Sequence, residues 1–223
     1  MERETAVVLG QRKLLQRLVP GLMHAFIFWG FLVLLTTIVE TAGQAIRESF
    51  GLPLIGHSAW LGLLQDVFAS LVLVGVVMAF SIRKIQRPER FVGSHLREAD
   101  FILLAIAGIV LTLFVVNATR IALGIAEAPT AWTPVSEALS RAIDTFSPGA
   151  VRSLEHVFTW AHLTLIVAFL VYIPYSKHLH ILTSFFTVFL SSTAPRGRLA
   201  PLRIDLASAA EADTHLGADT LEG

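Results

Sequence analysis

The chain has 223 residues, of which 54% are hydrophobic and 15% are charged, and its mean hydropathy is +0.68. These values exclude an ordinary soluble domain and predict an integral membrane protein. The net charge is zero, with 17 basic and 17 acidic residues, which excludes a nucleic-acid binder that relies on bulk positive charge. The chain has no cysteine, so only histidine, methionine and carboxylate side chains are left to hold a metal.

Four segments are long and apolar enough to cross a bilayer, which takes about 20 helical residues. They run from about residue 20 to 41, 60 to 82, 101 to 124 and 151 to 172. Pro174 follows the fourth segment, where we expect it to bend the helix, and residues 181–190 predict a C-terminal helix on the membrane surface. The predicted fold class is therefore all-α, an integral membrane helical bundle with four main transmembrane helices.

The loop between the third and fourth spans predicts an outer amphipathic helix. Thr133 and Pro134 are residue types that begin helices. The apolar residues that follow recur at helical spacing, at Val135, Leu139, Ile143 and Phe146. We expect this helix to lie on the outer surface of the bundle.

The basic residues are distributed unevenly between the loops. Thirteen of the 17 Lys and Arg residues precede the first span, separate the second from the third, or follow the fourth. The positive-inside rule then places both termini in the cytoplasm, in agreement with an even number of crossings. We therefore expect a cytoplasmic N-terminal segment over residues 1–19, a membrane domain over residues 20–194, and a flexible cytoplasmic linker or tail over residues 195–223.

Two histidines lie at the same predicted membrane depth. His24 is near the start of the first span, and His180 is just beyond the end of the fourth, so antiparallel spans bring both to the cytoplasmic side. Two imidazoles at one depth can ligate one haem iron from both faces of the porphyrin. The alternative is an interfacial pair that hydrogen-bonds to headgroups or carbonyls, and the sequence leaves both interpretations open.

His162 suggests a second haem site. It precedes His180 by 18 residues, or five turns, so both rings would share one face of a continuous helix. A partner is hard to find, because Leu34 occupies the place in the first span where an outer ligand is expected, and His57 in an outer loop is the remaining candidate. The alternative is that His162 is a hydrogen-bonded residue at a contact between helices.

Other polar residues in or near the spans also need partners. Asp66 and Arg120 lie on the outer halves of the second and third spans, and we predict an ion pair between them, with a quinol or proton pathway as the alternative. Lys177 and Arg17 lie at a depth where they could bind haem propionates, although ordinary positive-inside charges would occupy the same positions.

The segment Tyr-Ile-Pro-Tyr-Ser-Lys-His-Leu-His, residues 172–180, resembles the cytochrome b domain related to the gamma subunit of nitrate reductase. This domain occurs in membrane-bound iron-sulfur oxidoreductases of the heterodisulfide reductase and electron-transfer-flavoprotein:menaquinone oxidoreductase types. The resemblance covers about residues 10–195. It implies that His24, His162 and His180 ligate haem b, while the family's remaining ligand position is occupied by Leu34, where this sequence departs from the pattern.

The resemblance implies a haem b electron carrier that links a cytoplasmic iron-sulfur or flavoprotein partner to menaquinone in the bacterial cytoplasmic membrane. One haem or two would be bound, and quinone would be the substrate. Larger relatives continue into a region with cysteine-ligated clusters, so we expect a separate iron-sulfur subunit, a missing C-terminal iron-sulfur domain, or an electron-transfer flavoprotein as partner. The chain would not be catalytic without such a partner. The alternative function is a haem-free membrane anchor or assembly subunit of a respiratory oxidoreductase.

Overall fold

The computed structural model describes residues 16–86, 96–126, 128–176, 179–180, 183 and 190. Within these residues the chain is helical and has no strand. Four helices are long and apolar enough to cross a membrane, which confirms the predicted all-α bundle of four spans. They are α2 (Leu18–Ile46), α3 (Ala59–Ser81), α4 (Leu96–Ala122) and α6 (Pro148–Tyr172).

The chain divides into two compact units, residues 1–189 and 190–223, and every feature discussed below belongs to the first. The predicted linker or tail over residues 195–223 lies outside the described residues. The predicted C-terminal surface helix over residues 181–190 is described only at residues 183 and 190.

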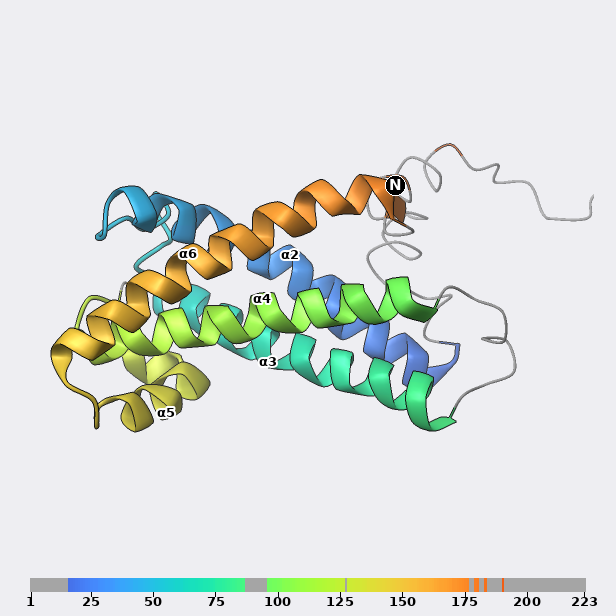
Figure 1. Ribbon diagram of the computed structural model, residues 1–223, viewed down its shortest axis with the longest axis horizontal. Coiled ribbons are helices and arrows are strands. Elements are labelled where there is room, and N and C mark those ends of the chain that lie inside the picture. Colours follow the sequence, from blue (N-terminus) through green and yellow to red (C-terminus); the bar gives the residue numbers. More distant parts are fainter. Residues whose placement is uncertain are drawn as a thin grey trace, which may run out of the picture. The chain divides into compact units, whose positions relative to one another are not determined.

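Successive spans run in opposite directions (Figure 1). Helix α2 packs mainly on α3, and α4 packs on α6 and on the short helix α5 (Pro134–Ile143). We call the end of the bundle where α5 lies the α5 end. The other end, where α6 stops and α2 begins, is the Tyr172 end.

Helices α2 and α3 approach closely because glycines face the partner helix. A Cβ atom on Gly30 would come within 2.1 Å of the Val72 side chain. A Cβ atom on Gly75 would lie 3.0 Å from the Ile27 side chain and 3.1 Å from the Met23 carbonyl oxygen. Small residues at such a contact let two membrane helices gain van der Waals packing where lipid supplies no hydrophobic driving force.

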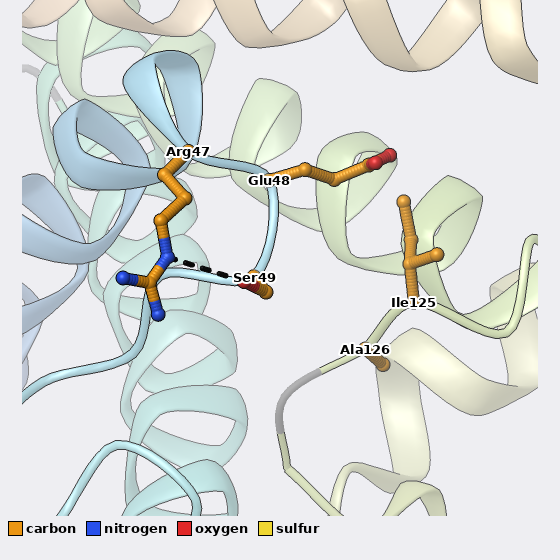
Figure 2. A pocket seen from close by; sticks show the side chains of 5 residues that line it. All are labelled: Arg47, Glu48, Ser49, Ile125 and Ala126. Carbon is orange, nitrogen blue, oxygen red and sulfur yellow. Dashed lines mark hydrogen bonds between the residues drawn. The ribbon is translucent and has the colours of Figure 1, made fainter.

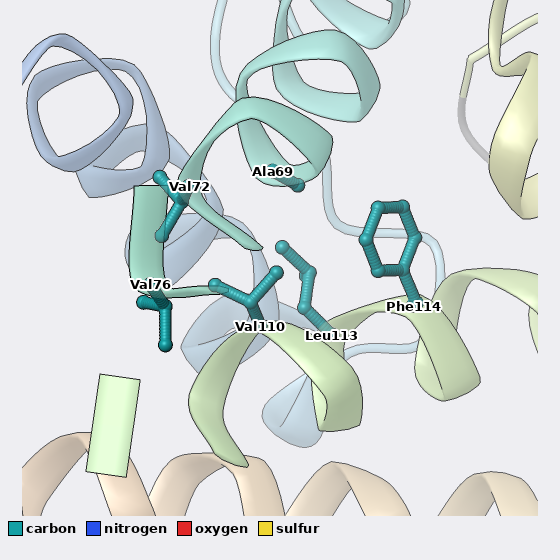
Figure 3. Packing of buried hydrophobic residues seen from close by; sticks show 6 residues of the cluster. All are labelled: Ala69, Val72, Val76, Val110, Leu113 and Phe114. Atoms are coloured by element: carbon teal, nitrogen blue, oxygen red, sulfur yellow. The ribbon is translucent and has the colours of Figure 1, made fainter. Parts of the chain in front are cut away.

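Apolar side chains fill the space between α3 and α4. Figure 3 shows this cluster, made of Ala69, Val72 and Val76 from α3 with Val110, Leu113 and Phe114 from α4. Many other large apolar side chains are exposed, among them Val77 at 64% and Val157 at 62%. Such exposure is expected for the lipid-facing surface of a membrane bundle.

Helix α5 confirms the helix predicted in the loop between the third and fourth spans, and its first residue is Pro134. The side that packs against the bundle is formed by Ser136, Ser140 and Ile143, which are buried. Val135 and Leu139, from the predicted apolar stripe, are exposed instead. The apolar stripe therefore faces mainly away from the bundle, as suits a helix at a membrane interface.

The end of the fourth span differs from the prediction. Helix α6 ends at Tyr172, a 3₁₀ turn follows over Ile173–Tyr175 (η5), and Ser176 is extended with φ −112° and ψ 170°. Pro174 therefore ends the α-helix instead of bending it, since proline lacks the N–H that the next turn needs. His180 is helical again after this break, so the five-turn relation between His162 and His180 does not hold.

Candidate functional site

His162 is completely buried in α6, with an exposed fraction of 0%. Its Nδ1 atom lies 2.9 Å from the hydroxyl oxygen of Thr112 on α4. That hydroxyl has one hydrogen, which it donates to the carbonyl oxygens of Gly108 at 2.8 Å and Ile109 at 2.9 Å. When the hydroxyl donates to either carbonyl, it can only accept from the ring, and Nδ1 of His162 then carries the proton.

The other ring nitrogen of His162, Nε2, has no hydrogen-bond partner among the described residues. Leaving a buried polar atom unsatisfied costs about 1–3 kcal/mol, so such atoms are rare and need an explanation. A neutral imidazole that donates through one nitrogen and presents a bare lone pair on the other has the form of a metal-ligating histidine. With Nδ1 as the donor, His162 would be able to ligate a haem iron through Nε2.

His24 and His180 meet at the Tyr172 end. His24 is half-buried in the second turn of α2, and its ring stacks on Phe28 one turn later, with centroids 6.4 Å apart and planes at 17°. His180 is exposed, and it lies close enough to His24 for a charge on one ring to act on the other. The described residues contain no group of three or more His, Asp or Glu side chains able to hold a metal ion. A haem iron needs only two imidazoles, so His24 and His180 would be the residues that hold a haem at this end.

The positions that bear on a second haem are Leu34, which replaces an expected ligand, and the predicted ligands His57 and His162. Leu34 packs against the α3–α4 core cluster, as its apolar side chain requires. His57 is exposed in the loop before α3, and its ring lies against Gly51 of the same loop. His162 is about 21 Å along α6 from Pro148, at 1.5 Å per residue. The structure thus keeps His57 in a surface loop at the α5 end and His162 deep in the bundle.

The predicted propionate ligands are basic residues near the Tyr172 end. Arg17 is the exposed residue that precedes α2, and Lys177 lies outside the described residues. Nearby, Arg83 and Lys84 both bind Asp100 at the start of α4, at 3.0 Å and 2.5 Å. This carboxylate ties the π-helical turn Ile82–Gln86 (η2) to α4.

The predicted ion pair between Asp66 and Arg120 is wrong. Asp66 is 2% exposed, and it accepts hydrogen bonds from the backbone N–H groups of Val135 at 2.7 Å and Ser136 at 3.1 Å. It also accepts from the Ser136 hydroxyl at 2.6 Å. A carboxylate satisfies the free N–H groups in the first turn of a helix and suits the positive end of its dipole. Asp66 therefore fastens α5 to α3.

Arg120 pairs instead with Glu155 of α6. Its Nη1 lies 3.3 Å from the Glu155 carboxylate, and both side chains are almost fully buried. Its Nη2 donates to the carbonyl oxygen of Glu48 at 2.7 Å and to that of Ile125 at 3.2 Å. The guanidinium therefore joins α4, α6 and two connecting segments at the α5 end. The predicted depths of the residues could not show that Arg120 pairs with Glu155 and not with Asp66, because the pairing depends on how each helix is rotated about its axis.

The α5 end also contains a small polar pocket. The polar side chains that line it are Glu40, Gln44, Gln65, Asn117, Arg120 and Thr133. Gln65 Nε2 donates to Glu40 Oε2 at 2.7 Å and to the Thr36 hydroxyl at 3.1 Å. Sequence reasoning missed Glu40 and Glu155 as candidate functional residues. The available signal was the presence of a carboxylate inside a predicted span, which is costly and therefore informative.

A larger cavity, of about 420 Å³, opens between the loops that follow α2 and α4. Figure 2 shows it, with Arg47 bonded to Ser49 and Glu48 extending the other way, towards the loop of Ile125 and Ala126. The Glu48 carboxylate binds Arg152 of α6. This hydrogen bond holds the pKa of Glu48 below its usual value. The cavity is lined by surface residues and includes none of the predicted ligands.

The fold and these sites define a four-span helical membrane protein in which one deeply buried histidine nitrogen is left without a hydrogen bond and two further histidines lie at the Tyr172 end. No protein-family model matches the chain, and no solved structure does.

Two curated proteins are similar to the chain. One is the probable iron-sulfur-binding oxidoreductase FadF of Bacillus subtilis strain 168, 25% identical over 193 residues, which cover 86% of this chain and 27% of the relative. The other is the EtfAB:quinone oxidoreductase of Syntrophomonas wolfei, 28% identical over 185 residues, which cover 78% of this chain and 25% of the relative. The chain thus spans about a quarter of the length of these relatives, and both are named as oxidoreductases.

Proposed function

We propose that this chain is the membrane domain of a quinone-linked oxidoreductase and holds haem b. In this proposal it carries electrons between a cytoplasmic iron-sulfur or flavoprotein partner and menaquinone. Four membrane spans support a position in the bilayer, where quinones dissolve. The names of the two relatives, one iron-sulfur-binding and one a quinone oxidoreductase, support the chemistry of the partners.

The observation that carries the haem assignment is the buried, unpartnered Nε2 of His162. His162 would provide one ligand, and His24 and His180 would provide both ligands of a haem at the Tyr172 end. Haem, when bound, supplies one-electron chemistry at its iron. The chain's own contribution is to fix the His162 tautomer through Thr112, orient the His24 ring against Phe28, and keep water away from the buried ligand.

The same proposal places the protein in the bacterial cytoplasmic membrane with both termini in the cytoplasm. The Tyr172 end then faces the cytoplasm, where an iron-sulfur subunit, an iron-sulfur domain or an electron-transfer flavoprotein would deliver or accept electrons. Arg17 and Lys177 are the basic residues at that end that we assign to haem propionates.

The test is a reduced-minus-oxidised absorption spectrum of the purified protein, with haem quantified as its pyridine complex. We expect a b-type band in the wild type and its loss or marked reduction in H24A, H180A and H162A. The control is H57A, which removes an exposed loop imidazole and should keep the wild-type haem content. A wild type without a b-type band would refute the haem proposal. A band that survives both H24A and H180A would refute that ligand pair.

A haem-free membrane anchor is the second candidate, and the exposure of His180 favours it. In that case the two histidines at the Tyr172 end would contact water or lipid headgroups. The purified wild type would lack the b-type band and would still co-purify with its iron-sulfur or flavoprotein partner.

A further inference from the structure

The polar pocket at the α5 end is a feature that the proposed electron-carrying role does not use. Helices α2, α3 and α4 enclose it, together with the loop between α2 and α3 and the segment that leads into α5. It brings a carboxylate, a guanidinium and several amide groups together next to apolar spans. Polar and ionisable groups at such a position mark a pathway for ions, protons or polar ligands more often than they serve packing.

The size of the pocket separates these possibilities. Its volume is about 60 Å³. Sites for small organic ligands and cofactors hold about 300–1,000 Å³, whereas one water occupies about 30 Å³ in the liquid. The pocket is thus far too small for a quinone ring and large enough for one or two waters, which its polar lining could bind with several hydrogen bonds.

Glu40 is the group that links this pocket to the bilayer. The Glu40 residue is 9% exposed. It belongs to α2, which is the least buried of the four spans, with 11% of its apolar stretch buried inside the protein. Gln65 holds its carboxylate at 2.7 Å. Its neighbour Val39 is 51% exposed on the outside of α2, so Glu40 belongs to a stretch of helix that adjoins both the pocket and the lipid-facing surface.

The charges around Glu40 have distinct partners. From α4, Arg120 lines the same pocket, and behind it Glu155 of α6 binds the guanidinium. From α3, Asp66 follows Gln65 directly but is directed to the first turn of α5. From the connecting segments, the pocket is lined by Gly56, Ala126, Ala128 and Thr133, none of which titrates. Among the residues that line the pocket, Glu40 therefore supplies the carboxylate.

We propose that Glu40 transfers protons between water in this pocket and a quinone ring bound at the bilayer face of α2. The proposal rests on the quinone-linked function proposed above. Reduction of a quinone to a quinol takes up two electrons and two protons. The electrons come from the iron-sulfur or flavoprotein partner. Each proton leaves the Glu40 carboxyl O–H for a quinone oxygen, and pocket water then passes a proton from the aqueous phase at the α5 end to the carboxylate, so that the water itself is unchanged. Quinol oxidation reverses each transfer.

The test uses the full protein with its electron-transfer partner, in liposomes that contain a menaquinone analogue. E40Q keeps the size and polarity of the side chain and removes the transferable proton. We expect E40Q to lower quinone turnover at least tenfold with an unchanged KM for quinone, and E40D to recover part of the rate with a larger solvent deuterium isotope effect. The matched control is E48Q, which changes an exposed carboxylate at the same end and should stay within twofold of wild type.

The outcomes separate the two proposals. A wild type that turns over no quinone overturns the quinone-linked function and this inference together. Turnover of E40Q within twofold of wild type overturns the proton transfer alone. A raised KM with unchanged kcat means that Glu40 binds the quinone, which also overturns it. If E40Q does not fold, infrared difference spectra of wild type and E40D decide: a protonated carboxyl band that E40D shifts supports the proposal, and an identical band overturns it.

Discussion

Replacing Arg120 by methionine should strongly destabilise the protein. The substitution leaves the Glu155 carboxylate, 5% exposed, without the cation that now lies 3.3 Å away. Breaking a buried ion pair by removing one partner costs about 3–5 kcal/mol, because the remaining charge stays desolvated. The carbonyl groups of Glu48 and Ile125 also lose a charged donor. We therefore expect R120M to lower the free energy of unfolding by about 4 kcal/mol.

The double variant R120M/E155M tests this reasoning. It removes both charges and leaves broken the bonds of Arg120 to the two carbonyls and the bond from the Thr159 hydroxyl to Glu155, so it should cost about 2 kcal/mol less than R120M alone. Unfolding is measured by titrating denaturing detergent into mild-detergent micelles and following tryptophan fluorescence. The control is R141M, which breaks the exposed Arg141–Glu137 pair on α5 and should change stability by less than about 1 kcal/mol. The reasoning fails if R120M costs no more than R141M, or if the double variant is as unstable as the single one.

Three further predictions concern helix contacts and pH. D66A should loosen α5 and lower the free energy of unfolding by about 1–3 kcal/mol, because it leaves the first N–H groups of the helix without acceptors. Hydrogen exchange of the α5 amides measures this loosening. The control is D144A, which changes an exposed carboxylate. G30A should lower the free energy of unfolding by about 1–3 kcal/mol, because the added methyl group forces α2 away from α3. The control is G108A, which should be neutral in the same unfolding titration, since its Cβ atom would lie 3.7 Å from its nearest neighbour. The pKa of Glu48 is lowered in the folded state, so its stabilising contribution is present above the unfolded pKa and is lost as the pH falls through the folded pKa. E48Q should remove this part of the acid dependence of unfolding, and an unchanged pH profile of stability would contradict the pairing.

The spans could be predicted from the sequence because the length of an apolar run is a one-dimensional property. The helices nevertheless extend beyond the apolar runs. Helix α2 reaches Ile46, although the apolar run ends near residue 41, because Glu40 and Gln44 are held in polar surroundings inside the bundle. The start of α5 could also be predicted, since Pro134 marks the first turn of a helix directly.

The partners of the buried polar groups could not be predicted. The contact between Thr112 and His162 joins residues 50 positions apart, and it depends on how far α4 and α6 are each rotated about their axes. The same holds for Asp66, whose depth matched Arg120 but whose side chain faces α5. A single sequence gives the depth of a residue in a span and leaves its direction around the helix undetermined.

The hydrogen bonding of the buried polar side chains bears on where a cofactor would bind. At the α5 end, the structure gives each buried ionisable side chain a specific partner: Asp66 caps α5, and Arg120 pairs with Glu155. Among the described residues, the Nε2 atom of His162 is the one buried side-chain nitrogen or oxygen that lacks a hydrogen bond. A fold that satisfies its other buried polar side chains has no structural need for an open imidazole nitrogen, since leucine or phenylalanine would fill the same space without the desolvation cost. The His162 nitrogen is therefore the atom on which the haem proposal depends, because a bound haem iron would supply the partner that this atom lacks among the described residues.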